Sequence, residues 1–149
     1  MNLKEKKKCR VIIVRLLLLG YLILIFTKTV VFRPSQFSYK HHFAPLWSYM
    51  AIKQGYNELI AENILNVLLF IPIGFLFYMV IKSARWWAAL IFGAIISITI
   101  ECCQFAFNRG SAEFDDVIHN VLGCMLGYGI VFLFKKVYEV VSKRRIRVL

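Results

Sequence analysis

The chain has 149 residues, 60% of them apolar, and its 19 Lys and Arg residues outweigh 8 Asp and Glu residues for a net charge of +11. A disordered chain is excluded because disorder needs low hydrophobicity. A soluble nucleic-acid-binding protein is excluded because the apolar residues form long blocks rather than short amphipathic runs. The composition therefore predicts a small polytopic membrane protein, with a single domain over residues 1–149.

Four apolar blocks are each long enough to cross a bilayer, since a spanning helix needs about 20 mostly apolar residues. Arg15 and Lys28 interrupt the first block only near its ends, where their aliphatic stems reach the membrane surfaces. The predicted fold is an all-α bundle of four transmembrane helices, the first of them an uncleaved signal anchor. The predicted spans are residues 11–32, 61–81, 86–107 and 117–134, with basic tails at 1–10 and 135–149.

The positive charges predict the orientation of these helices, because cytoplasmic segments of membrane proteins are enriched in Lys and Arg. With a cytoplasmic N-terminus, most of the basic residues fall on the inner side, and the C-terminus is cytoplasmic too. Attraction to anionic lipid then explains the basic tails, and no nucleic-acid partner is expected. The basic residues left in the outer segments are Arg33, Lys40, Lys53 and Arg109.

The first outer segment, residues 33–60, is long and rich in aromatic residues of the kind that lie at headgroup level. It contains Trp47, Tyr49 and Tyr56, with His41 and His42 before them. We expect this segment to fold back on the membrane as a short interfacial helix or a re-entrant piece.

Polar side chains inside membrane spans are costly, so they are the strongest pointers to function. In the second span, Asn63 and Asn66 are three residues apart, on one helix face in the outer half. Simple hydrogen bonding between helices is the alternative for both amides. Pro72 and Gly74 fall at mid-span, where they are expected to kink the helix and admit a close neighbour.

The outer end of the third span carries Glu101 and Gln104, again three residues apart on one face. At 1.5 Å per residue, Glu101 lies about 9 Å below the end of the helix. A carboxyl group at this depth requires a proton or a cationic partner, and Arg109 is the candidate cation. In the alternative interpretation, Arg109 only closes the hairpin by pairing with Asp116 or Glu113.

The fourth span begins with a stripe of Asp116, Asn120, Gly123 and Gly127, spaced four, three and four residues apart. The two glycines form a GxxxG pair, which permits close contact between helices. Two further residues flank this stripe, and each has either a functional or a purely structural role. Asp115 is either a ligand-binding residue or a helix N-cap. His119 is either a site residue or an interfacial packing residue.

A short connection makes the third and fourth helices antiparallel neighbours, so their polar stripes face each other. We predict an outward-facing polar pocket in the outer leaflet. No cofactor is expected, and the histidines and cysteines lack the spacing of a zinc site. The predicted ligand-binding residues are Asn66, Glu101, Gln104, Arg109, Asp115, Asp116 and Asn120. The predicted helix-packing residues are Pro72, Gly74, Gly123 and Gly127. Weak candidates for a metal site are Asp115, Asp116 and His119.

This ordered set of residues resembles the VanZ-like family, which is named for an accessory protein of glycopeptide-resistance clusters. The resemblance covers roughly residues 33–134. It implies a multi-pass protein of the bacterial plasma membrane, linked to resistance against teicoplanin-type lipoglycopeptides, which carry an acyl tail and act at the outer face. The matching residues are Asn66, Leu69, Phe70, Pro72, Gly74, Glu101, Gln104, Arg109, Glu113, Asp115, Asp116, Asn120, Gly123 and Gly127.

Three functions are compatible with this pattern. The favoured one is binding of an amphipathic ligand, either the lipoglycopeptide or an undecaprenyl-linked wall precursor, with Arg109 at a phosphate or carboxylate. The second is an enzyme acting on a lipid-linked intermediate, with Glu101 as general acid or base and Asp115 and Asp116 on a divalent cation. The third is a lipid or drug transporter, which would need a homodimer. The GxxxG pair is one way to form that interface, although closing the bundle within one chain is the favoured role for it. Binding is favoured over catalysis because the sequence shows no nucleophile and no metal-spaced histidines.

Overall fold

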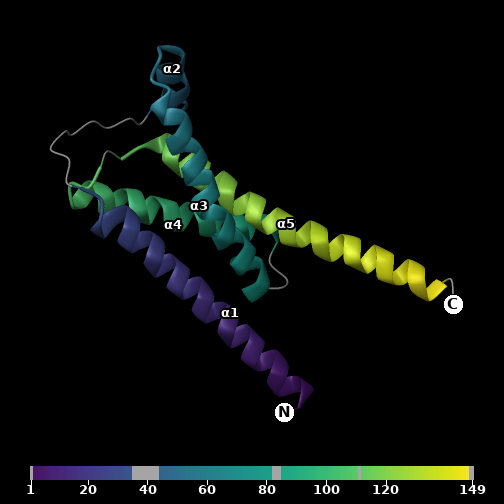
Figure 1. Ribbon diagram of the computed structural model, residues 1–149. Helices are drawn as coiled ribbons and strands as arrows, with labels where there is room; N and C mark the ends of the chain where they lie inside the picture. Colours follow the sequence, from purple (N-terminus) through teal and green to yellow (C-terminus); the bar gives the residue numbers. More distant parts are fainter. Residues whose placement is uncertain (1, 35–43, 82–84, 111, 148–149) are drawn as a thin grey trace.

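A computed structural model describes residues 2–34, 44–81, 85–110 and 112–147, with side chains up to residue 143 (Figure 1). His41 and His42 lie outside the described residues. Within the described ranges, the regular elements are helices. They are α1 (Leu3–Phe26), the π-helical turn η1 (Thr27–Val31), α2 (Trp47–Lys53), α3 (Glu58–Val80), α4 (Trp86–Ala106) and α5 (Phe114–Arg147).

Four of these helical segments are long and apolar enough to cross a membrane, which confirms the predicted all-α fold. The helices extend beyond the predicted spans at both chain ends. α1 begins at Leu3 and α5 continues to Arg147, so most of each predicted basic tail is helical. Lys and Arg are good helix formers, and they therefore prolong a helix that the apolar run begins. At 34 residues, α5 is about 51 Å long and exceeds a hydrocarbon core of about 30 Å.

Figure 1 shows the two terminal ends of the chain on the same side of the molecule, at the lower right, and α2 on the opposite side. α2 lies over the start of α3, in the segment where a short helix was expected. Its chain enters through Leu46, whose φ of 64° places it in the left-handed region. Whether α2 lies at a membrane surface, and which side is cytoplasmic, stay predictions.

Glycines bring α3 and α5 into direct backbone contact. A Cβ atom at Gly123 would collide with the carbonyl of Val67, and one at Gly127 with the carbonyl of Ile71. From the other helix, a Cβ atom at Gly74 would collide with the carbonyl of Cys124. The predicted packing glycines therefore lie at a helix interface within one chain, where close approach replaces side-chain volume. α3 continues as a helix through Pro72.

The apolar core fills the space between the four long helices at mid-height. It contains Ile25 of α1, Phe70 and Ile73 of α3, Ile100 of α4 and Cys124 of α5. α1 is the least buried of the spanning helices. It is tied to α3 by the hydroxyl of Tyr21, which donates a hydrogen bond of 3.0 Å to the carbonyl of Leu69.

Candidate functional site

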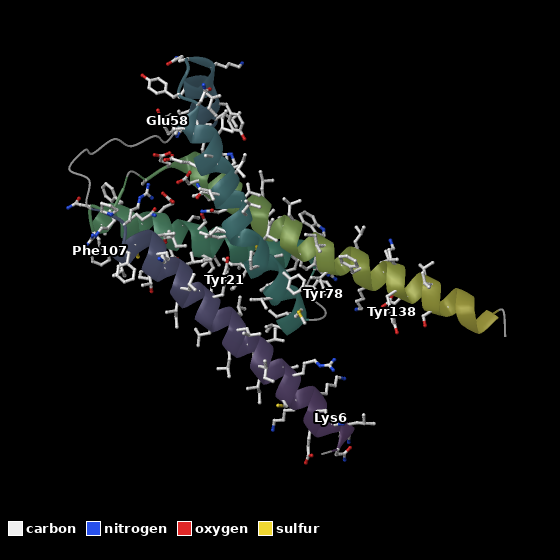
Figure 2. The ribbon with its side chains drawn as sticks, viewed as in Figure 1. Lys6, Tyr21, Glu58, Tyr78, Phe107 and Tyr138 are labelled. Atoms are coloured by element: carbon white, nitrogen blue, oxygen red, sulfur yellow. The ribbon has the colours of Figure 1, made fainter. Side chains whose placement is uncertain are left out.

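Polar side chains gather at the end of the bundle where η1 and α4 finish and where α2, α3 and α5 start, which we call the polar end (Figure 2). In Figure 2 it lies between the labelled residues Glu58 and Phe107. The predicted ligand-binding residues lie toward this end of their helices, except for Arg109, which lies in the connection between α4 and α5. The buried polar or charged residues of the described chain are Ser48, Ser97, Glu101, Gln104, Asp115, His119 and Asn120.

Asp115 fixes α2 to the bundle. Its side chain is only 1% exposed, and its two carboxylate oxygens accept three hydrogen bonds from the start of α2. The backbone N–H of Leu46 donates at 2.6 Å, while the N–H and hydroxyl of Ser48 donate at 2.9 and 2.6 Å. Asn63 of α3 donates to the same hydroxyl at 3.3 Å. Asp115 lies in the first turn of α5 and is not the N-cap of that helix; its carboxylate instead accepts the N–H groups at the start of α2.

Asp116 turns toward a different neighbour, because consecutive residues of a helix point about 100° apart. Its Oδ1 accepts a hydrogen bond of 2.7 Å from the side-chain amide of Asn66. Two of the predicted site residues, one from α3 and one from α5, are therefore in direct contact. Unlike Asp115, Asp116 is only partly buried.

Glu101 is buried near the end of α4, with 7% of its surface exposed. Its Oε2 accepts a hydrogen bond of 3.1 Å from the backbone N–H of Glu113, which ties α4 to the start of α5. The charges of Asp116, Glu113 and Arg33 all act on Glu101, and Arg33 also acts on Asp116. Three carboxyl groups and one guanidinium therefore act on one another at the polar end.

The hydrogen bonds of Arg109 join it to backbone carbonyls, whereas the sequence predicted that it pairs with Glu101. Its Nη1 donates a hydrogen bond of 2.8 Å to the carbonyl of Arg33, and its own N–H donates to the carbonyl of Gln104 at 2.7 Å. It therefore holds the chain after η1 against the end of α4. The guanidinium that acts on Glu101 and Asp116 belongs to Arg33, which packs over Gly110.

Gln104 and Asn120 use their amide groups to link helices. Gln104 Nε2 donates to the carbonyl of Thr29 at 3.1 Å, and Asn120 Nδ2 donates to the hydroxyl of Ser97 at 2.9 Å. Within the described part of the chain, the two amide oxygens are buried without a hydrogen-bond partner. Such an acceptor costs about 1–3 kcal/mol when it is left unpaired, so both oxygens are available for a donor from water or a ligand.

His119 packs against α2. Its Nε2 lies 2.9 Å from the hydroxyl of Tyr49, and the two rings have centroids 5.8 Å apart. Among the described residues, no group of three His, Cys, Asp or Glu side chains is arranged to hold a metal ion. The geometry around His119 is therefore that of a packing residue that joins α2 to α5.

Two grooves open beside these groups. The first, of about 430 Å³, lies between α4 and α5, and Glu101 and Glu113 line it together with apolar side chains such as Ile98, Phe105 and Val117. We call it the acidic groove. The second, of about 480 Å³, lies among α2, α3 and α5, and its lining includes Asn63, Tyr49 and His119.

These features define a multi-pass membrane protein whose buried polar groups converge at one end of a helical bundle. A family model described as VanZ/LLP1 matches residues 12–135, and the chain belongs to this family. Protein VanZ of Enterococcus faecium is 36% identical over 75 residues, which are 50% of this chain and 47% of that relative. The aligned region thus spans about half of the relative's length. No solved structure matches the chain.

The sequence patterns missed the partners of the predicted residues. The charge pattern assigns Arg33 only a role in topology, although this residue directly follows the first span and so lies at the same end of the bundle as Glu101. Ser48 of α2 and Ser97 of α4 were not singled out, since a lone serine carries little signal. Thr29 contributes only its backbone carbonyl, which no side-chain pattern reveals.

Proposed function

We propose that this protein contributes to resistance against teicoplanin-type lipoglycopeptides by binding the lipoglycopeptide itself at the polar end. The acidic groove carries this proposal. Its walls are almost wholly apolar, which suits an acyl chain, and the carboxyl-bearing residues Glu101 and Glu113 are among its lining residues. An amphipathic ligand needs both surfaces, and protein binding sites are typically apolar with a few convergent polar groups.

The charge of the cluster favours the lipoglycopeptide over an undecaprenyl-linked precursor. Glu101, Asp116 and Glu113 offer no positive charge to the phosphate of a lipid-linked precursor, and among the groups that act on Glu101 and Asp116 only Arg33 would attract it. A peptide presents N–H groups, which carboxylates and buried amide oxygens accept.

The proposal places the polar end at the outer surface of a bacterial plasma membrane and both termini in the cytoplasm. The distribution of charge supports this orientation, because the basic ends of α1 and α5 lie on the side of the molecule opposite α2 (Figure 1). The enzymatic alternative loses support from the geometry of Asp115. Its carboxylate is engaged by α2 and does not face a metal site shared with Asp116.

The test replaces Glu101 by Gln in the full chain and measures susceptibility of a sensitive host to teicoplanin and to vancomycin. We expect Glu101→Gln to lower teicoplanin resistance at least about tenfold, because an amide makes different hydrogen bonds from a carboxyl group and a buried polar group left unsatisfied costs about 1–3 kcal/mol. The vancomycin response should not change, since that drug lacks the acyl tail.

The matched control is Glu58→Gln, which removes the same charge from an exposed position at the start of α3. The control should keep full resistance, and both variants should reach the membrane in equal amounts, as measured by immunoblot. Purified Glu101→Gln protein should also bind teicoplanin more weakly than the control in a fluorescence titration. Unchanged resistance and binding in Glu101→Gln would overturn the proposal.

A further inference from the structure

A third groove lies at the other end of the bundle, at the boundary between the apolar spans and their basic extensions. It has a volume of about 330 Å³ and is formed by α1, α3 and α5. Val11 and Val14 of α1, Met79 of α3 and Val131 of α5 give it apolar walls. We call it the basic groove, because its remaining lining includes two cations, Arg10 and Lys135.

The two cations come from helices that are far apart in the sequence, yet they lie at equivalent levels. Arg10 is the last basic residue before the apolar run of α1, and Lys135 is the first one after the apolar run of α5. Both side chains are exposed. The basic groove therefore has positive charge where the headgroups of a bilayer would lie and apolar walls where its hydrocarbon would begin.

Aromatic residues hold one of these cations over the basic groove. The Lys135 ammonium lies 6.0 Å from the ring centre of Tyr78, within the range of a cation–π contact. Tyr78 is buried on α3 and meets Tyr128 of α5 edge-on, with ring centroids 5.1 Å apart. Figure 2 shows Tyr78 near the lower end of α3, beside α5. The buried tyrosine pair thus gives the groove an aromatic floor beside the Lys135 ammonium.

We propose that the basic groove is a binding site for one anionic phospholipid of the adjacent leaflet. Its phosphate would bind between Arg10 and Lys135, and one acyl chain would lie along Val11, Val14 and Val131. Basic recesses between transmembrane helices are suited to anionic headgroups, and charge complementarity selects an anionic lipid over a zwitterionic one. A bound lipid would also join α1 to α5, and α1 is the least buried of the spanning helices.

The site differs from general attraction between the basic tails and the membrane, and matched pairs of substitutions separate the two. The site pair is Arg10→Gln with Lys135→Gln. The control pair is Lys8→Gln with Lys136→Gln, which removes the same charge from exposed residues of the same two helices that do not line the groove. All four residues are exposed, so neither pair threatens folding.

Native mass spectrometry of the full chain in detergent, titrated with phosphatidylglycerol or phosphatidylcholine of identical chains, measures the selectivity. We expect the unsubstituted chain and the control pair to bind phosphatidylglycerol preferentially. A basic residue near an anionic lipid is worth about fivefold in binding, so the site pair should lose roughly 25-fold in affinity for phosphatidylglycerol. Phosphatidylglycerol should raise the melting temperature of the control pair and not that of the site pair.

Three outcomes would overturn the inference. One is an equal loss of selectivity in both pairs, which would mean nonspecific attraction. Another is full selectivity in the site pair. The third is displacement of the lipid by inorganic phosphate at an equal concentration, which would indicate a phosphate site that does not use the apolar walls. Glu101→Gln should keep the lipid selectivity, so this inference stands or fails separately from the function proposed for the polar end.

Discussion

The two ends of this bundle handle charge in opposite ways. At the polar end, Glu101, Asp115 and Asp116 are buried or partly buried, and each accepts a hydrogen bond from another segment. At the basic end, the lysines and arginines of α1 and α5 are exposed over the whole part whose side chains are described. Charge at the first end is held in specific contacts, while charge at the second end stays exposed.

This difference follows from solvation. An exposed Lys or Arg stays hydrated, so its position on the helix surface can vary with little effect on stability. A buried carboxylate must replace its water with hydrogen-bond donors, and those donors must be placed by the fold. Asp115 meets this demand with the start of α2, and Asp116 meets it with Asn66. The polar end is therefore sensitive to single substitutions, and the basic end is tolerant of them.

The largest expected effect comes from the helix contact that supports both ends. We expect Gly127→Ala to destabilise the protein by at least about 3 kcal/mol, because its Cβ atom would collide with the backbone carbonyl of Ile71 and no flexible side chain can move aside. Thermal unfolding in detergent, followed by size-exclusion chromatography, measures the loss.

Gly129→Ala is the matched control on the same helix, since a Cβ atom there would meet nothing within 4 Å. It should leave the melting temperature unchanged or slightly higher, because alanine favours a helix. Equal melting temperatures for the two variants would show that the α3–α5 contact is looser than the structure describes. That result would weaken the contrast between the polar end and the basic end, because the α3–α5 contact fixes the positions of both ends.

A smaller and more local effect is expected from Asp115→Asn. The neutral amide cannot accept all three hydrogen bonds from Leu46 and Ser48, so we expect a local loss of about 1–3 kcal/mol. Hydrogen–deuterium exchange should accelerate in residues 46–53 and stay unchanged in α4. Asp116→Asn is the control, because Asp116 does not contact α2, and unaltered exchange of α2 in Asp115→Asn would contradict the capping role.

The same contrast explains how much of the structure the sequence could predict. Apolar length and the glycine pattern were sufficient for the four helices and for the close contact between α3 and α5. The spacing of Asn66, Glu101 and Asp116 was sufficient to place them at one end. Their partners were not predictable, because the hydrogen bonds that satisfy Asp115 and Asp116 join residues 69 and 50 positions apart. No local spacing encodes such a pairing.

Arg33 and Arg109 show most clearly which contacts the sequence could not predict. Both are basic residues near the same membrane boundary, and the pattern favoured Arg109 as the partner of Glu101 because it is closer in the sequence. In the structure, Arg109 donates to the backbone of Arg33, and it is the charge of Arg33 that acts on the acids. The path of the chain after η1 determines which arginine acts on the acidic residues, and helix periodicity does not predict that path.

The smallest effect should come from Tyr49→Phe, which removes one neutral hydrogen bond to His119 and keeps the ring contact. We expect a loss of about 1 kcal/mol in stability, because a typical intramolecular hydrogen bond contributes about 0.5–1.5 kcal/mol.

Tyr56→Phe, at an exposed position beyond α2, should change nothing measurable. Teicoplanin resistance should persist in both, because neither residue lines the acidic groove. A loss of resistance in Tyr49→Phe at unchanged stability would move the binding site to the groove of about 480 Å³ that Tyr49 and His119 line.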